Sequence, residues 1–336
     1  DNEIEVEDEE GLVESHTIPD CPEPYFRGQK GGIYFRPTDD ESDPIFIYAH
    51  DLYVLKRMTD PNMSDVVVMK VHLPRDGIKE FVVPNTSIAD KKELKSELAK
   101  NGVVTSDKKF PFLVDFVIKS IQELQYKKKA ESMRLQFGWA DRDSKFILGD
   151  REITPMGTFH SPPSSTTKEL VPYIQPEGSL EEWKEVFNLY GKPGLEPHAF
   201  ATLSAFGSPI LKFFGQKGAI INVIHPTSGT GKTTILHMCN SVYGNPEKLC
   251  STWQDTMMSK ILRLGILNNL PFCVDEITNM SAKDFSTLAY SMSQGRGRDR
   301  MKSSSNELRV NSTTWQAISL CSSNASFNEK LGSLKS

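Results

Sequence analysis

The sequence has few cysteines and no long apolar run, and both absences narrow its function. The five cysteines are scattered, odd in number and include no Cys-x-x-Cys pair. They predict no metal site and are typical of a reducing, cytosolic environment. No apolar run approaches the roughly 20 residues that a membrane-spanning helix needs, so we expect no membrane partner. The net charge of −5 disfavours a basic surface that wraps duplex DNA but allows a local basic loop.

The 336 residues are enough for two domains, and changes in composition suggest their limits. Residues 1–30 begin with seven acidic side chains among the first ten, which predicts a flexible, solvated segment. Residues 31–160 mix β-branched or aromatic runs with helical stretches and predict an α+β domain. Residues 161–175 are rich in Pro, Ser and Thr and are expected to form a linker. The second domain would then occupy residues 176–336.

The second domain contains the pattern of a phosphate-binding loop. The apolar run 219–224 predicts a strand, the loop 226–231 follows, and a helical pattern begins at Lys232. Glycines let backbone N–H groups approach triphosphate oxygens, and the positive end of the helix points to the same place. Pro226 stands where the usual pattern has glycine and donates no N–H, so the motif is a variant. The alternative is a glycine-rich turn without a ligand.

This motif predicts binding of ATP with Mg²⁺. Lys232 would reach the β- and γ-phosphates, and the hydroxyl of Thr233 would ligate Mg²⁺. The residues expected to bind the nucleotide are Pro226, Thr227, Ser228, Gly229, Thr230, Gly231, Lys232, Thr233 and Thr234.

A second apolar strand, 270–274, ends in the adjacent carboxylates Asp275 and Glu276. A strand that ends in Asp-Glu downstream of a phosphate-binding loop is typical of ATP hydrolysis. Asp275 would support Mg²⁺, and Glu276 would act as the general base on the attacking water. The alternative is a buried strand that ends in an ordinary polar turn.

A third strand, 313–322, ends in Ser323 and Asn324. A polar side chain at that strand end could contact the γ-phosphate or the attacking water, so Asn324 is a further catalytic candidate. The alternative is that Asn324 begins a turn, as Asn often does.

The segment 294–309 concentrates basic side chains among Gly and Ser. Its candidate residues are Arg296, Arg298, Arg300, Lys302 and Arg309. They could bind DNA phosphates, or one arginine could act as a finger on the γ-phosphate of a neighbouring subunit. The alternative is a solvated loop. Because the loop has no aromatic residue, DNA contacts would be to the backbone and tolerant of sequence.

These motifs resemble those of the AAA+ ATPases, with 226–233 as Walker A, 272–276 as Walker B and 323–324 as sensor 1. More narrowly, the chain resembles the helicase part of bacteriophage and mobile-element primase–helicase proteins, a family often catalogued as a domain of unknown function. The segments that carry this narrower resemblance are 135–139, 146–150, 198–209, 252–256 and 295–301. The resemblance implies a ring, as a hexamer, that hydrolyses ATP at subunit interfaces and moves along single-stranded DNA during replication.

From the resemblance we also expect a primase domain or protein as a partner and, for a phage protein, the cytoplasm of a bacterial host. The sequence departs from the AAA+ pattern in one respect: the 336 residues include no C-terminal lid, so either the lid lies outside these residues or it is missing. The expected fold is an α/β P-loop NTPase with a mainly parallel sheet, preceded by the smaller α+β domain.

The leading functional hypothesis is an ATP-driven DNA helicase or translocase. The second hypothesis is a nucleotide-gated AAA+ assembly switch or loader that does not move DNA. The position of the basic loop discriminates between them, because a helicase needs that loop to face DNA. A small-molecule kinase is disfavoured, since such enzymes seldom combine the Asp-Glu pair with a third polar strand end.

Overall fold

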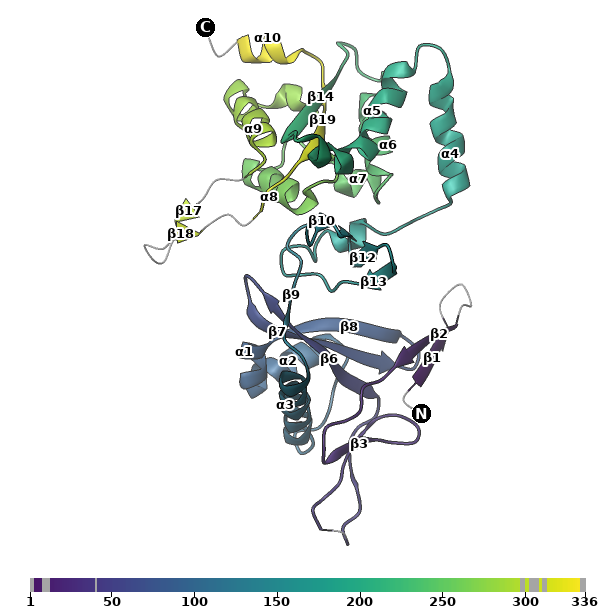
Figure 1. Cartoon of the computed structure of the whole chain (residues 1–336), viewed down its shortest axis with the longest axis vertical. Coiled ribbons are helices and arrows are strands. Elements are labelled where there is room, and N and C mark those ends of the chain that lie inside the picture. Colours follow the sequence, from purple (N-terminus) through teal and green to yellow (C-terminus); the bar gives the residue numbers. More distant parts are fainter. Residues whose placement is uncertain are drawn as a thin grey trace. The chain divides into compact units, whose positions relative to one another are not determined.

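The structure is a computed structural model that describes residues 3–7, 13–39, 41–296, 300–301, 308–309 and 313–332. It divides into two compact units, residues 1–133 and 134–336, and each is described by itself (Figure 1). Within the described ranges, no helix combines the length and apolarity that crossing a bilayer requires.

The first unit consists mainly of antiparallel strands with three helices. Its elements are β1 (Glu3–Glu7), β2 (Val13–Thr17), β3 (Tyr25–Arg27), β4 (Ile33–Phe35), β5 (Ile45–Tyr48), β6 (Asp51–Asp60), β7 (Ser64–Leu73), β8 (Gly77–Pro84), α1 (Asn85–Ala89), α2 (Lys91–Lys100), α3 (Phe110–Lys127) and β9 (Glu131–Ser132). The strands form a β1–β2 hairpin, a β3-β4-β5 sheet and a sheet of order β8-β7-β6-β9. The α+β domain was expected over residues 31–160, whereas residues 134–160 belong to the second unit.

The segment 1–30, expected to be flexible from its acidic composition, contains the strands β1, β2 and β3. In β1, Ile4 and Val6 alternate with glutamates, which is a strand period. Ile4 pairs with His16 of β2 across the hairpin. The alternation of apolar and acidic residues therefore indicates a strand, whereas the number of charges alone does not.

The core of the first unit lies between the longer sheet and α3. Val67, Met69 and Val71 on one face of β7 belong to a cluster that includes Phe116 and Val117 of α3. The opposite face of β7 is buried in a smaller cluster with Met58 and Met133. Because β7 is buried on both faces, its sequence is an almost continuous apolar run.

The second unit begins with a small antiparallel sheet and continues into helices around a parallel sheet. Its elements are β10 (Gly138–Ala140), β11 (Lys145–Leu148), β12 (Arg151–Thr154), β13 (Gly157–His160), η1 (Val171–Tyr173), α4 (Leu180–Asn188), η2 (Leu189–Gly191), α5 (Glu196–Gly207), η3 (Ser208–Phe214), β14 (Gly218–Ile224), α6 (Lys232–Asn240), α7 (Pro246–Leu249), β15 (Ser251–Thr252), α8 (Met257–Leu267), β16 (Phe272–Asp275), η4 (Ile277–Asn279), α9 (Ala282–Gln294), β17 (Arg300–Met301), β18 (Leu308–Arg309), β19 (Ala317–Ser323) and α10 (Phe327–Gly332).

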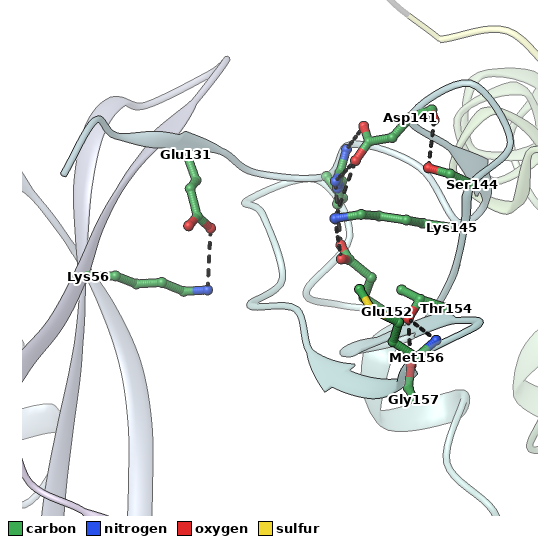
Figure 2. Close-up of polar contacts among 10 residues, drawn as sticks. Lys56, Glu131, Asp141, Ser144, Lys145, Glu152, Thr154, Met156 and Gly157 are labelled. Atoms are coloured by element: carbon green, nitrogen blue, oxygen red, sulfur yellow. Dashed lines mark hydrogen bonds and ion pairs between the residues drawn. The ribbon is translucent and has the colours of Figure 1, made fainter.

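A cluster of ion pairs joins the strands of the small sheet. Arg134 donates to both carboxylate oxygens of Asp141, at 2.7 and 2.6 Å. Lys145 pairs with Glu152 across β11 and β12 and lies 3.5 Å from Asp141 (Figure 2). Hydrogen bonding to Arg134 lowers the pKa of Asp141, so this carboxylate stays ionised in the folded state.

The segment 161–175, expected to be a linker, packs into the second unit. Ser164 accepts a hydrogen bond from the backbone N–H of Thr167 at 3.3 Å. Leu170, Val171 and Ile174 are buried in a core cluster. The division between the units instead falls after residue 133. Serine and threonine here serve local turns, which composition alone does not distinguish from a linker.

The parallel sheet of the second unit has the strand order β14-β19-β16-β15. Alternate residues of β16 face opposite cores: Phe272 and Val274 pack with α8 and α9, and Cys273 packs with α5 and α6. These helix pairs lie on the two sides of the sheet (Figure 1). The unit is therefore a three-layer α/β arrangement with a parallel sheet, and the expected α/β class is confirmed at this level.

Candidate functional site

The loop between β14 and α6 contains two glycines whose backbone conformation is rare for residues that have a side chain. Gly229 has a φ of 74° and Gly231, at the helix N-cap, a φ of 85°. The backbone N–H of Thr227 donates to Nδ1 of His225 at 3.1 Å, which stabilises the start of the loop. The strand, loop and helix thus occur where the sequence predicts them, and the helix N-terminus faces the loop.

The ammonium group of Lys232 lies against the loop. It donates to the carbonyl oxygens of His225 and Thr227, at 3.0 and 2.9 Å. Because an ammonium has three N–H donors, the third is available for a ligand. The charge of Lys232 is thereby placed beside the backbone that would hold an anion.

Parallel strands bring the other candidate residues to the same edge. Ile224 at the end of β14 pairs with Ser323 of β19, and Cys321 of β19 pairs with Val274 of β16. The carboxyl ends of these strands therefore meet next to the loop, where ligands bind in open α/β sheets. A cavity of about 300 Å³ opens there.

Most of the predicted site residues line this cavity. Its lining residues are Ser228, Gly229, Thr230, Gly231, Lys232, Thr233, Thr234, Glu276, Thr278, Asn279, Ser322, Ser323 and Asn324. Pro226 and Thr227 belong to the loop but not to the cavity wall.

Asp275 is the centre of the hydrogen bonds at the strand ends. The Thr233 hydroxyl donates to its Oδ2 at 3.0 Å, and the Ser322 hydroxyl donates to its Oδ1. The backbone N–H of Glu276 lies 3.1 Å from the same Oδ1. Thr233 and Asp275, the two predicted Mg²⁺ ligands, are therefore adjacent. Their hydroxyl and carboxylate oxygens are the kind of metal ligand that Mg²⁺ prefers.

Glu276 and Asp275 are consecutive, but their carboxylates accept hydrogen bonds from different side chains. The φ of Glu276, 55°, is left-handed, which is uncommon outside glycine and concentrates at functional sites. Its backbone N–H donates to the Ser322 hydroxyl at 2.8 Å. Asn279 donates from Nδ2 to the carboxylate of Glu276 at 3.2 Å. This turn therefore gives each of the two carboxylates its own position.

The sequence does not predict two contacts of the site: that of Ser322 with Asp275 and that of Asn279 with Glu276. The sequence prediction took Ser323 and Asn324 as the polar end of β19. In the structure, Ser323 bonds to Asn222 and to the carbonyl of Ala325. Asn324 lines the cavity and donates its backbone N–H to Thr278 at 2.7 Å. Adjacent residues of a strand face opposite sides of the sheet. This alternation could have distinguished Ser322 from its neighbour Ser323.

The basic candidates lie on and beside a hairpin. Arg296 is exposed, and its backbone pairs with Thr314. Arg300 of β17 pairs with Arg309 of β18 in antiparallel register. Arg298 and Lys302 fall outside the described residues. In Figure 1 the hairpin extends from the side of the unit that carries α8 and α9.

The model of the family described as "Domain of unknown function (DUF927)" matches residues 26–312, which is most of the chain. The chain belongs to the DUF927 family. No curated protein matches it. The family match extends across both units and includes the loop, Asp275 and Glu276.

The DUF927 chain is also similar to a solved structure, that of the SCCmec type IV Cch protein described as an active helicase. The TM-score is 0.61 at 18% sequence identity, over 91% of this chain and 55% of the other. The DUF927 chain thus spans about half the length of that helicase. At this identity, the likeness shows a shared fold.

Proposed function

We propose that this DUF927 protein is an ATP-driven DNA helicase or translocase of the AAA+ type. The observation that carries the proposal is the contact between Thr233 and Asp275 beside Lys232. The Thr233 hydroxyl, the Asp275 carboxylate and the Lys232 ammonium lie at the N-terminus of α6, next to a cavity of about 300 Å³. This is the set of groups that a Mg²⁺-bound triphosphate requires.

The loop residues and Lys232 bind the phosphates in this proposal. Thr233 and Asp275 would hold Mg²⁺, with the Thr233 hydroxyl as a ligand and the Asp275 carboxylate as its support. The metal would neutralise charge on the β- and γ-phosphates. Ser322 donates to Asp275 and so orients its carboxylate toward Thr233. A buried hydroxyl suits this role because its own hydrogen bonds restrict it to one position.

Glu276 is the proposed general base. Its carboxylate accepts a proton from the water that attacks the γ-phosphate, and Asn279 holds that carboxylate by one hydrogen bond. Asn324, on the same cavity wall, contacts the γ-phosphate or the attacking water. A general base must lie within hydrogen-bonding reach of its water, and Glu276 lines the cavity in which that water would lie.

The β17–β18 hairpin is the proposed DNA-binding element. Arg296, Arg298, Arg300, Lys302 and Arg309 supply cations for backbone phosphates, or one arginine serves the site of a neighbouring subunit in a ring. Similarity to the fold of an active helicase supports the DNA part of the proposal. Arginine suits either role because its planar fork matches phosphate oxygens.

The test is ATP hydrolysis with and without single-stranded DNA. Lys232→Ala and Glu276→Gln should each lower turnover by at least about a hundredfold. Glu247→Gln, an exposed carboxylate on α7, is the matched control and should leave turnover unchanged. Replacing Arg296, Arg298 and Arg300 by Gln should remove stimulation by DNA. Undiminished turnover in Glu276→Gln would contradict the assigned base.

The same experiment addresses the assembly switch. Turnover that ignores DNA, together with an ATP-dependent change in molar mass, would favour the switch over the motor. Strand displacement on a forked duplex would favour the motor.

A further inference from the structure

The β3-β4-β5 sheet of the first unit carries three aromatic side chains in a row across its strands. Register pairs Phe26 with Tyr34 and Tyr34 with Phe46. The first two rings are stacked with centroids 5.6 Å apart, and the second two are tilted with centroids 5.3 Å apart. We call these three residues the aromatic row. Their strand neighbours Tyr25 and Ile33 are buried in the core, so the row lies on the opposite face.

The aromatic row is partly accessible to solvent. Phe46 is 39% exposed, and Phe26 and Tyr34 are half-buried. Aromatic pairs across strands stabilise a sheet, but a purely structural role does not require accessible rings. Accessible π-faces are what a planar ligand needs for stacking.

Each end of the row has a cation over its ring. The Arg36 guanidinium lies 5.1 Å from the Phe26 centroid, and the Lys109 ammonium lies 4.3 Å from the Phe46 centroid. Within the described part of the chain, neither side chain makes an ion pair with a carboxylate. Both charges are therefore available to an anionic ligand that follows the row.

A cavity of about 330 Å³ opens beside the Phe46 end of the row. Phe46, His50 and Lys109 are among the residues that line it. It combines an aromatic wall with an imidazole and an ammonium group, so it provides both stacking and hydrogen bonding. Pockets of this kind bind planar, polar groups.

The backbone holds the middle ring of the row in place. A Cβ on Gly28 would collide with the Tyr34 ring, so the ring lies directly over the backbone of Gly28. The absence of a side chain at this position lets Tyr34 lie between its two partners. The row is thereby preorganised, which reduces the entropy lost on binding.

We propose that the aromatic row binds single-stranded nucleic acid. Bases pack against the exposed parts of Phe26, Tyr34 and Phe46, and Arg36 and Lys109 turn from the rings of Phe26 and Phe46 to pair with backbone phosphates. Sheet faces that combine stacking aromatics with a few cations bind single strands in this way, since every base has a π-face. This site lies in a different unit from the nucleotide site and does not depend on ATP hydrolysis.

The local charge favours a single strand over a duplex. The connection between β4 and β5 carries Asp39, Glu41 and Asp43, which repel the dense charge of a double helix. Two cations on the row neutralise about two phosphates. The salt dependence should therefore be shallow, with a log–log slope of roughly −1.4, about 0.7 for each phosphate contact of a single strand.

The test measures binding of a fluorescein-labelled oligo(dT) of about 12 nucleotides to the full chain without ATP. Arg296, Arg298 and Arg300 are replaced by Gln in every protein, so that the hairpin does not mask the row. Tyr34→Ala and Phe46→Ala should each weaken binding roughly tenfold or more. Tyr126→Ala is the matched control, because this α3 tyrosine is 93% exposed, and it should bind as the parent does. Equal affinity of all four proteins would overturn the proposal.

Three further measurements separate stacking from misfolding and from other ligands. Tyr34→Phe keeps the ring and should bind normally, whereas Phe46→Leu keeps the apolar bulk and should not. Arg36→Gln and Lys109→Gln should each reduce the salt slope by about 0.7, and an unchanged slope would overturn the phosphate contacts. Oligo(rU) in place of oligo(dT) distinguishes RNA from DNA. Binding to neither would overturn the proposal and assign the row to protein contacts.

Failure of this proposal is distinguishable from failure of the proposed function. Loss of ATP turnover in Glu276→Gln concerns the nucleotide site, and oligonucleotide binding is measured without ATP. The row variants should keep the parent's circular dichroism and its DNA-independent turnover.

Discussion

In the second unit, the candidate site residues lie at the carboxyl ends of parallel strands, whereas in the first unit the aromatic row crosses three antiparallel strands. Asp275 is the last residue of β16 and Glu276 comes next, and Thr233 is the second residue of α6, the helix that begins where the loop after β14 ends. Phe26, Tyr34 and Phe46 belong to separate strands and meet only through register. Side chains that are distant in the sequence are therefore brought together by parallel strand ends in the second unit and by antiparallel register in the first.

This difference teaches where a functional site can be recognised. In a parallel sheet, every strand delivers its next residues to the same edge, so motifs at strand ends converge without knowledge of register. In an antiparallel sheet, a shift of one residue moves a side chain to the other face. A bulge between β4 and β5 makes Phe46, rather than Ile47, the partner of Tyr34.

The largest effect is expected from the Thr233–Asp275 pair. Thr233→Ala and Asp275→Asn should each lower ATP turnover at least about a hundredfold, because Mg²⁺ loses a ligand or its orientation. The double variant should be little worse than either single variant, since both changes affect one site. Steady-state kinetics against Mg²⁺ concentration would measure this. Additive losses would contradict a shared metal site.

A smaller effect is expected from the two adjacent serines of β19. Ser322→Ala should lower kcat roughly tenfold, because Asp275 and the N–H of Glu276 lose a hydrogen-bond partner. Ser323→Ala is the matched control, since its hydroxyl bonds to Asn222 and Ala325 instead. A greater loss of kcat in Ser323→Ala than in Ser322→Ala would contradict the role of Ser322 in orienting Asp275.

Paired and unpaired cations should differ in their effect on stability. Arg134→Ala should lower the free energy of unfolding by about 1 kcal/mol, because Arg134 bonds to Asp141. Arg36→Ala, without an ion pair in the described structure, should change it by less than about 0.5 kcal/mol. Urea unfolding followed by circular dichroism measures both values. Equal losses would contradict a mainly structural role for the Arg134 cluster.

The same cluster predicts a dependence of stability on pH. The pKa of Asp141 is lowered by its hydrogen bond to Arg134, so the folded state favours the ionised carboxylate. This stabilisation is complete above the unfolded pKa of about 3.9 and is lost as the pH falls through the lower folded value. Acid titration of the unfolding midpoint should be shallower in Arg134→Ala. An identical titration would contradict the assignment.

The smallest effect is expected at the cysteines, where burial should slow the alkylation of the thiols. Burial raises the pKa of Cys250 and of Cys321 to about 12, and that of Cys21 to about 11. Because the thiolate is the reactive form, iodoacetamide should label the folded chain at pH 8 far more slowly than the urea-unfolded chain. Peptide mapping after alkylation would measure each site. Rapid labelling of Cys321 in the folded chain would contradict its burial between strands.

The sequence by itself determined the loop before Lys232, the adjacent carboxylates Asp275 and Glu276, and the parallel arrangement that brings them together. These features depend on local rules: glycine at left-handed turns, apolar runs for strands buried on both faces, and a helix that begins where the loop ends. Each signal lies within a short segment, so no long-range contact is needed to recognise it.

Only the tertiary structure decided that Ser322, and not Ser323, contacts Asp275, that residues 161–175 pack into a core, and that the aromatic row exists. Composition does not distinguish a packed Ser/Thr turn from an open linker, since both contain the same residues. The row depends on register and on a bulge between strands. Those are fixed by which face of the sheet is buried against the rest of the unit, which is a property of the whole unit.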